Sequence, residues 1–547
     1  MYTPVARGGA IEADVGEIDA TLTRLERARA AIETGIQLVT IAKQKAEQKV
    51  AEKLPDHLKP QASRVLMALA LVVALTLLGV AASVMLYDGR ADAAEVPRDT
   101  LASSMQRPTS VLEIDASPPP PSNSPAFKTP MRAARGFVML TPPSSQGRVF
   151  MREGQPYRFV GMNMWAGMHL VHEGGRAKLV RELDRLQSMG VRSLRVLASG
   201  EGPDDSPWRL LPTLQPKMHM YSEPLARGLD YLLAELAVRD MTATLVLNNQ
   251  WSWSGGQAAY LAWATGSENI PFPAPAGSAT VDSFLRFSAG FYTDARAVAA
   301  SHWLISFLTR RMNSVSNVKY ADDPTIMAWE MCNEPRAVGG PLEREAYRLW
   351  VAQTAALLKA LAPKQLVTIG SEGMTPIPQY IGTDFAADHS SLHIDFATVH
   401  IRPEVWSWYD PVVGNEEELE QAIRMSQQYL ANHAMIARRL GKPLVLQELA
   451  LSRDGGAFIA TAPTTSRDRY FDALLRSVHE SAEVAGAQLW AWAGEGRPKE
   501  AGVHWVLGDE LIGDPPQERQ GHYSIFDTDV TTVATIAKWS TRFHEYT

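Results

Sequence analysis

The stretch IMAWEMCNEPR (326–336) decides the fold class of this 547-residue chain. It begins as an apolar run of strand length and ends in polar residues, among them Asn333 and Glu334. Seven other short, apolar, β-prone runs occur in the same part of the chain: RFVGMNM (158–164), SLRVLA (193–198), TATLVLNN (242–249), LVTIGS (366–371), FATVHI (396–401), LVLQEL (444–449) and AQLWAW (487–492). Amphipathic helical stretches separate these runs, which indicates repeated βα units around a parallel sheet.

Eight such strands predict a (β/α)₈ TIM barrel over residues 136–547. This segment is longer than a typical barrel of about 250 residues, so long βα loops are expected, the longest from Trp251 to about Ala300. An open doubly wound sheet is the alternative fold. It would need a glycine-rich phosphate-binding turn, and the chain has no G-x-G-x-x-G motif.

The first 164 residues are built differently, because all 14 tryptophans lie between Trp165 and Trp539, and this implies a domain boundary near residue 136. Residues 65–87 carry no charge and exceed the roughly 20 helical residues that cross a bilayer, which predicts a transmembrane signal anchor. A cleaved signal peptide is the alternative, but such peptides lie at the extreme N-terminus and have shorter apolar cores. Basic residues are denser before the span, so the N-terminus is expected in the cytoplasm and the barrel in the periplasm, in a lumen or at the cell surface.

The segments on either side of this span suggest tethering. In residues 1–64, apolar residues follow heptad spacing from Ile11 to Val50, so residues 11–50 could self-associate as a coiled coil or lie on the membrane as one amphipathic helix. Residues 88–135 contain SPPPPSNSP (117–125), a composition that favours polyproline II and predicts a disordered stem.

Charge and cysteine content exclude several classes of function. The net charge of -7 is spread over both signs without a long basic run, so no nucleic-acid partner is expected. The single cysteine, Cys332, rules out an intramolecular disulfide framework and a zinc cluster of several thiolates.

Polar residues gather at the ends of the predicted strands, where barrel enzymes place their active sites. Glu334 follows the fourth strand and Glu448 ends the seventh. Two carboxylates facing each other across a barrel mouth suit retaining glycoside hydrolysis, which needs them about 5 to 5.5 Å apart. A lone glutamate at a strand end is more often a structural ion-pair partner. The pair, together with the sequence Asn-Glu-Pro, favours catalysis.

Several separated motifs resemble glycoside hydrolase family 5, and within it the endo-β-1,4-mannanases. The resemblance covers residues 136–547 and is most specific in PTIMAWEMCNEPR (324–336) and KPLVLQELALSRDG (442–455). Further similar segments are NNQWSWSGGQAAYLAWA (248–264), HIRPEVWSWYDP (400–411), QLWAWAGEGRP (488–498) and GDPPQERQGHYSIFDTD (513–529).

This resemblance implies a role for each matching residue. Glu334 would be the acid/base, with a raised pKa, and Glu448 the nucleophile. Asn333 would bind the sugar 2-hydroxyl, and Arg195 would hold Glu448 ionised, although a purely structural ion pair is the alternative for Arg195. His400 would belong to the acid/base network and Trp490 would form the floor under the sugar. Candidate walls of an elongated cleft are Trp165, Trp251, Trp253, Trp406, Trp408 and Trp492. The implied substrate is mannan, glucomannan or galactomannan, and no metal or organic cofactor is implied.

The chain also departs from the family pattern. Arg402 stands where many members have a tyrosine that hydrogen-bonds the nucleophile, so its cation could stabilise Glu448 or point away. Gln447 and Leu449 flank Glu448 where a glutamate and a phenylalanine are usual. A β-glucanase or transglycosylase therefore stays open as an alternative. So does a catalytically impaired, membrane-tethered polysaccharide-binding protein.

Overall fold

The structure, a computed structural model, describes residues 136–545 except for 145–146, 173, 206–207, 268 and 377–380. The predicted helical segment 1–64, membrane span 65–87 and stem 88–135 lie outside the described residues and stay predictions. Among the helices that are described, none combines the length and the apolar character needed to cross a bilayer.

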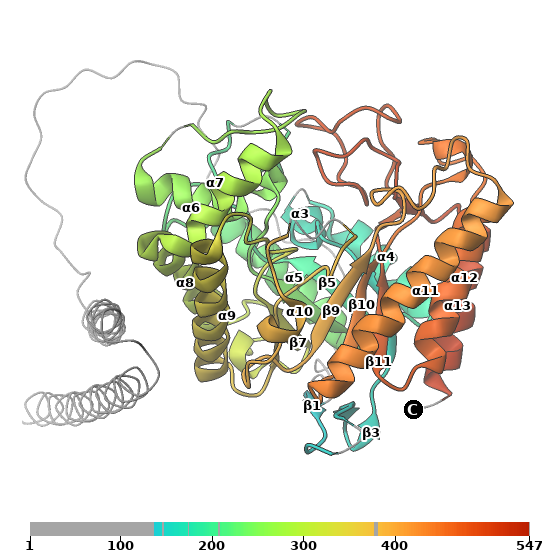
Figure 1. The fold of residues 1–547 in the computed structure, drawn as a ribbon, viewed down its shortest axis with the longest axis horizontal. Helices are drawn as coiled ribbons and strands as arrows, with labels where there is room; N and C mark the ends of the chain where they lie inside the picture. Colours follow the sequence, from blue (N-terminus) through green and yellow to red (C-terminus); the bar gives the residue numbers. More distant parts are fainter. Residues whose placement is uncertain are drawn as a thin grey trace, which may run out of the picture. The chain divides into compact units, whose positions relative to one another are not determined.

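Eight parallel strands form the centre of the molecule (Figure 1). Their order is β8-β7-β6-β5-β4-β11-β10-β9. The end strands β8 and β9 meet through hydrogen bonds from Asp395 N to Val367 O (2.8 Å) and from Thr368 Oγ1 to Phe396 O (3.0 Å), which nearly close the ring. The strands are β4 (Phe159–Asn163), β5 (Ser193–Leu197), β6 (Thr242–Val246), β7 (Ile326–Glu330), β8 (Leu366–Thr368), β9 (Ala397–Ile401), β10 (Leu444–Leu449) and β11 (Val484–Leu489).

All eight predicted barrel strands are present, and the eighth differs most from its expected bounds. β11 runs from Val484 to Leu489, so Trp490 follows the strand. Trp492 opens a separate strand, β12 (Trp492–Gly494), which pairs with β13 (Ile525–Phe526). The prediction that the eighth strand itself carries Trp490 and Trp492 was wrong, because the chain leaves the barrel after Leu489 to join this second ladder.

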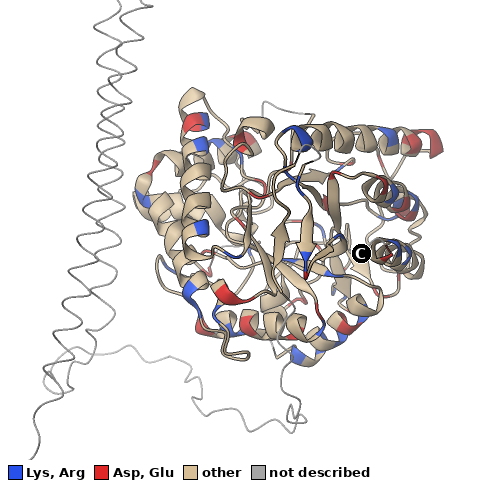
Figure 2. Ribbon diagram, turned by 90° about the horizontal axis from the view of Figure 1, so that it is seen from below, with Lys and Arg blue, Asp and Glu red and all other residues tan. Residues whose placement is uncertain are grey.

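Helices surround the barrel, as Figures 1 and 2 show from two directions. In Figure 2, Lys and Arg are interspersed with Asp and Glu around this outer layer. The predicted long insertion after β6 is confirmed, because it contains two extra helices, α6 and α7. The helices are α3 (Gly167–His172), α4 (Arg176–Ser188), α5 (Glu223–Val238), α6 (Gly256–Thr265), α7 (Val281–Thr293), α8 (Ala295–Arg310), α9 (Pro341–Leu361), α10 (Phe385–Asp388), α11 (Glu416–Arg439), α12 (Thr465–Glu480) and α13 (Val530–His544).

Helix α11 shows why these segments are helical. Its N-cap Asn415 accepts hydrogen bonds from the backbone N–H groups of Glu417 (2.9 Å) and Glu418 (3.1 Å). Acidic residues fill the first turn and Arg438 and Arg439 the last turn, which complements the helix dipole. The buried stripe of this helix, including Leu419, packs into the main hydrophobic core.

A small antiparallel sheet closes the N-terminal end of the barrel. It consists of β1 (Val138–Leu140), β2 (Phe150–Arg152) and β3 (Gln155–Pro156). Phe150 packs edge-on against Phe396, with ring centroids 5.3 Å apart, in a cluster that contains the first residues of several strands. Since this end is filled by apolar side chains, the carboxyl ends of the strands are left for a functional site.

Candidate active site

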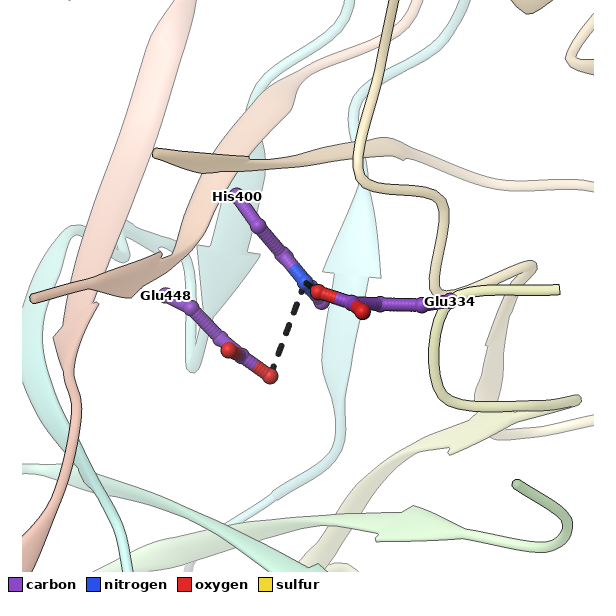
Figure 3. Close-up of side chains that lie close together, drawn as sticks. All are labelled: Glu334, His400 and Glu448. Atoms are coloured by element: carbon purple, nitrogen blue, oxygen red, sulfur yellow. Dashed lines mark hydrogen bonds and ion pairs between the residues drawn. The ribbon is translucent and has the colours of Figure 1, made fainter. Parts of the chain in front are cut away.

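Glu334, His400 and Glu448 converge at the carboxyl end of the barrel (Figure 3). One oxygen of each carboxylate and one ring nitrogen of His400 all lie within 4.8 Å of one another. His400 Nδ1 lies 2.7 Å from Glu334 Oε1 and 3.5 Å from Glu448 Oε1. The structure thus brings together the two glutamates and the histidine that the sequence selected.

Strand register explains how these side chains meet. His400 on β9 is paired with Glu448 on β10, and Asn163 on β4 is paired with Arg195 on β5. Residues paired across neighbouring strands point to the same side, so both pairs project into the barrel. The four side chains are almost fully buried.

Glu334 lies beyond the end of β7 and has a backbone φ of 50°. Such left-handed conformations are uncommon for residues other than glycine and cluster at functional sites. Its Oε2 accepts a hydrogen bond from Trp251 Nε1 (2.7 Å), while Oε1 faces His400. Both carboxylate oxygens are therefore held in place.

The pKa of Glu334 lies below its usual range, which reverses the expectation from the sequence. Burial alone would raise it, but the hydrogen bond and charge of His400, and then the charges of Arg336 and Arg402, outweigh burial. The pKa of His400 is raised for the complementary reason: burial opposes its charge, and Glu448 and Glu334 favour it. The two pKa shifts have one physical cause, the contact between His400 and Glu334, and both favour the charged form of each group.

Glu448 is held between two guanidinium groups. Arg195 Nη1 donates to its Oε1 (2.6 Å) and Arg402 Nη2 donates to its Oε2 (2.5 Å). Such charge-assisted bonds are stronger than neutral ones. Both oxygens of this carboxylate therefore face a fixed positive charge.

Arg195 makes the contacts that both alternatives from the sequence require. Besides Glu448, it binds Glu330 in a two-bond pair (2.9 and 2.6 Å), and it donates to Asn163 Oδ1 (3.0 Å) and to Asn333 Oδ1 (2.7 Å). Arg195 thus forms a buried ion pair with Glu330 and also contacts the predicted nucleophile Glu448. Asn333 in turn donates to Asn249 Oδ1 (3.0 Å), which fixes its amide.

Glu330 is the main site residue that the sequence analysis missed. It is the last residue of β7 and fully buried. Its Oε2 also accepts a hydrogen bond from Gln447 Nε2 (2.6 Å). A donor at position 447 therefore suits this chain, because it satisfies Glu330 without adding another buried negative charge. The signal in the sequence that could have identified Glu330 is its charge, since it is a glutamate within the otherwise apolar run IMAWEMC (326–332).

Arg402 points toward Glu448 and not away from it. Its guanidinium stacks over the ring of Trp490 at 4.7 Å and over that of Tyr523 at 5.3 Å. Tyr523 comes from the loop before β13, a part of the chain that the sequence gave no reason to connect with Arg402.

A further ion pair lies on the Glu334 side of the site. Arg336 makes a two-bond pair with Glu372 (2.8 and 3.0 Å) and stacks over Trp251 at 4.8 Å. His400 N donates to Glu372 O (3.1 Å). Glu372 follows β8 in the segment Ser371–Gly373, so only its position near a strand end could have singled it out.

The predicted tryptophans separate into three groups. Trp251 contacts Glu334, and Trp490 packs against Arg402 and shares a buried cluster with Trp165 and Trp253. Trp406 and Trp408 pack on each other and on Tyr429 of α11, and Trp492 donates to Glu182 of α4 (2.8 Å). Most of these rings are buried among protein side chains. Trp251 and Trp490 lie beside the groups around Glu334 and Glu448, whereas Trp406, Trp408 and Trp492 pack toward helices α11 and α4.

The three converging residues could in principle coordinate a cation, since each offers one ligand atom. However, the two Glu448 oxygens already accept bonds from Arg195 and Arg402, and His400 Nδ1 is engaged with Glu334. A divalent ion would have to break these bonds and lie beside two guanidinium groups. The arrangement fits proton transfer and nucleophilic attack better than metal binding.

Comparison with known proteins gives a consistent result. Residues 140–546 match the family described as GH family 5 beta-mannosidase-like. Mannan endo-1,4-beta-mannosidase 1 of Solanum lycopersicum is 30% identical over 357 residues, which are 62% of this chain and 81% of that protein. Mannan endo-1,4-beta-mannosidase 3 of Oryza sativa subsp. japonica is 28% identical over 414 residues, 72% of this chain and 79% of that protein.

Solved structures agree with the architecture. The glycoside hydrolase family 5 mannosidase from Rhizomucor miehei superposes with a TM-score of 0.68 at 32% identity, over 76% of this chain and 99% of that chain. The endo-1,4-beta-mannanase from the same organism has a TM-score of 0.55 at 22% identity, over 75% and 100%, and shares the fold.

Proposed function

The chain belongs to the glycoside hydrolase family 5 β-mannosidase-like family and is a glycoside hydrolase, and from this premise we propose that it hydrolyses β-1,4-mannosidic linkages with retention of configuration. Glu448 is the nucleophile and Glu334 the acid/base in this proposal. The substrates are mannan, glucomannan or galactomannan, and internal linkages are cleaved, as the names of the curated relatives suggest.

The separation of the two carboxylates carries the proposal. A Glu334 oxygen and a Glu448 oxygen lie within 4.8 Å of each other. Retaining glycosidases hold their carboxyl groups about 5 to 5.5 Å apart, whereas inverting enzymes leave about 6.5 to 9.5 Å for a water molecule. The observed distance supports direct attack by Glu448.

The reaction then takes two steps. First, a Glu448 oxygen attacks the anomeric carbon while the bond to the leaving oxygen breaks and Glu334 delivers a proton to that oxygen. Next, a water molecule attacks the same carbon, Glu334 accepts a proton from it, and the electron pair of the ester bond returns to Glu448. Asn333, whose amide is fixed by Arg195 and Asn249, would bind the sugar 2-hydroxyl.

We propose that His400 supplies the proton with which Glu334 acts as a general acid. Its Nδ1 lies 2.7 Å from Glu334 Oε1, and its raised pKa favours the imidazolium form. A sugar ring entering the site excludes water and leaves a buried anion beside a buried cation. Transfer of the proton from Nδ1 to Oε1 then makes Glu334 a general acid.

The direct test uses the full-length chain, the Glu334→Gln and Glu448→Gln variants, and three polysaccharides: galactomannan, glucomannan and cellulose. The proposal predicts reducing ends from the two mannans with the wild type, and losses of about 10²- to 10⁴-fold or more in each variant. Activity on cellulose alone would point to the β-glucanase alternative. Polysaccharide binding without turnover would point to the tethered binding protein.

A second candidate, cleavage from the chain end, is favoured by two contacts across the loops. Ser252 Oγ and Gln517 exchange hydrogen bonds of 3.1 and 2.9 Å, and Trp208 meets His504 with ring centroids 5.3 Å apart. These contacts join the loops after β6 and β5 to the segment between β12 and β13. A continuous polymer would need an open path between these loops, so we propose that the two contacts favour cleavage from the chain end.

Product length separates the two modes of cleavage. Internal cleavage of mannohexaose gives di-, tri- and tetrasaccharides from the first time point and lowers the viscosity of galactomannan quickly. Chain-end cleavage releases one product size and leaves the viscosity high. A Trp208→Ala/Gln517→Ala double variant should shift the pattern toward internal cleavage only if the two contacts block the cleft.

A further inference from the structure

We propose that Arg402 acts on the nucleophile Glu448 so that the glycosyl-enzyme breaks down faster than it forms. The inference rests on the proposed function, since it concerns the relative rates of its two steps. It starts from an unusual arrangement: each oxygen of Glu448 accepts a hydrogen bond from a different guanidinium group, Arg195 on one side and Arg402 on the other.

The contact from Arg402 is fixed and permanently charged. The side chain is 13% exposed, contacts the rings of Trp490 and Tyr523, and reaches Glu448 Oε2 at 2.5 Å. Arginine does not lose its proton in proteins, and the nearby carboxylates raise the pKa of Arg402 further against the effect of burial. A tyrosine at this position, the residue common in similar enzymes, would offer only a neutral hydroxyl group.

A cation at this place affects the two steps in opposite directions. Glu448 starts the first step with a full negative charge and becomes a neutral ester when its oxygen bonds to the anomeric carbon. Arg402 binds the charged form more strongly than the ester, so it stabilises the reactant of the first step.

In the second step the ester bond breaks and its electron pair returns to the carboxylate. The charge that Arg402 stabilises is now forming, so the same contact lowers the barrier. Glycosylation becomes the slower step, and the free enzyme, not the ester, is the species present during turnover.

Arg336 provides the matched control for Arg402. It is also a mostly buried guanidinium near the acid/base, but it pairs with Glu372 and stacks on Trp251, without a bond to Glu448. Removing Arg336 takes away the same charge and leaves the nucleophile's own contacts in place. It separates a specific effect on Glu448 from a general loss of positive charge.

The test is stopped-flow release of 2,4-dinitrophenolate from 2,4-dinitrophenyl β-mannobioside by the full-length chain, with intact-protein mass after acid quenching. Wild type and Arg336→Met should show no burst and little covalent adduct. Arg402→Met should show a burst close to one equivalent, a deglycosylation rate lower by about 10- to 100-fold, and accumulation of the glycosyl-enzyme. Arg402→Lys, which keeps a charge, should show a smaller burst than Arg402→Met.

Failure of the inference about Arg402 and failure of the proposed function give different results in this experiment. A burst in the wild type, or an Arg402→Met variant that turns over slowly without accumulating adduct, would overturn the inference and leave the proposed function intact. Failure of the wild type to cleave the mannobioside, or cleavage that survives Glu448→Gln, would instead overturn the proposed function. If Arg402→Met does not fold by circular dichroism, Arg402→Gln takes its place, with the same expected burst.

Discussion

The two flanks of Glu448 are built from different parts of the molecule. On one flank, Arg195 lies on β5 and reaches Glu330, Asn163 and Asn333, all on strands or immediately after them. On the other flank, Arg402 follows β9 and is held by the rings of Trp490 and Tyr523, which belong to the connections after β11. The first flank is part of the barrel, and the second depends on loops.

The contact from Arg195 follows from the barrel fold itself, whereas the contact from Arg402 depends on the loops of this particular sequence. Hydrogen bonds between paired strands fix the first flank, so any sequence that forms the barrel with these residues also forms the contact. The second flank needs two loops from distant parts of the chain to pack correctly. We therefore expect substitutions on the Arg195 flank to lower the stability of the fold, and substitutions on the loop flank to change the kinetics of the enzyme.

The largest effect is expected for Arg195→Met. It would leave Glu330 and Glu448 buried with a major cationic partner removed, and breaking a buried ion pair typically costs about 3 to 5 kcal/mol. Chemical denaturation should show this loss in the free energy of unfolding. Arg402→Met, where Glu448 keeps Arg195, is the control and should cost about 1 to 2 kcal/mol. Equal costs for the two variants would contradict the division into flanks.

A smaller effect is expected on the acid side from Trp251→Phe. The ring is kept, but the hydrogen bond from Nε1 to Glu334 Oε2 is lost. Since this bond orients the carboxyl group, kcat/KM should fall by about 5- to 20-fold while the melting temperature changes little. An unchanged kcat/KM would mean that His400 alone positions Glu334.

The barrel strands were predictable because each is a local apolar run, and the strand ends were predictable from polar residues that follow those runs. Glu334, Glu448, His400 and Arg195 came from this reasoning, and the structure gathers them. Glu330 was missed because its partner Arg195 is far away in sequence, and only strand register brings them together.

Other features depend on contacts that no local pattern contains. The direction of Arg402 is set by Tyr523, and the position of Trp492 by the pairing of β12 with β13. The pKa of Glu334 depends on charges from Arg336 and Arg402 that the motif alone does not locate. Tertiary packing of loops, not secondary structure, is what the sequence left undetermined.

The pH profile should respond to Arg336→Met in a defined direction. The charge of Arg336 helps to lower the pKa of Glu334. Removing it raises the pKa of the coupled Glu334–His400 pair, so the acid keeps its proton to higher pH. The basic limb of kcat/KM should move to higher pH, and a shift to lower pH would contradict the assignment of Glu334 as acid.

The smallest effect is expected for Trp492→Phe, which tests whether this ring belongs to the site. Its Nε1 donates to Glu182 on α4, so the variant should lose about 1 kcal/mol of stability. Its kcat and KM on mannohexaose should stay within about twofold of the wild type. A large rise in KM would instead return Trp492 to the substrate cleft, where the sequence first placed it.

The anomeric form of the first product tests the central claim most directly. Proton NMR of mannohexaose cleavage by the full-length chain, recorded before mutarotation, distinguishes the two outcomes. Carboxylate oxygens within 4.8 Å of each other predict that the β-anomer appears first and the α-anomer later. Initial release of the α-anomer would show inversion and contradict the role of Glu448 as nucleophile.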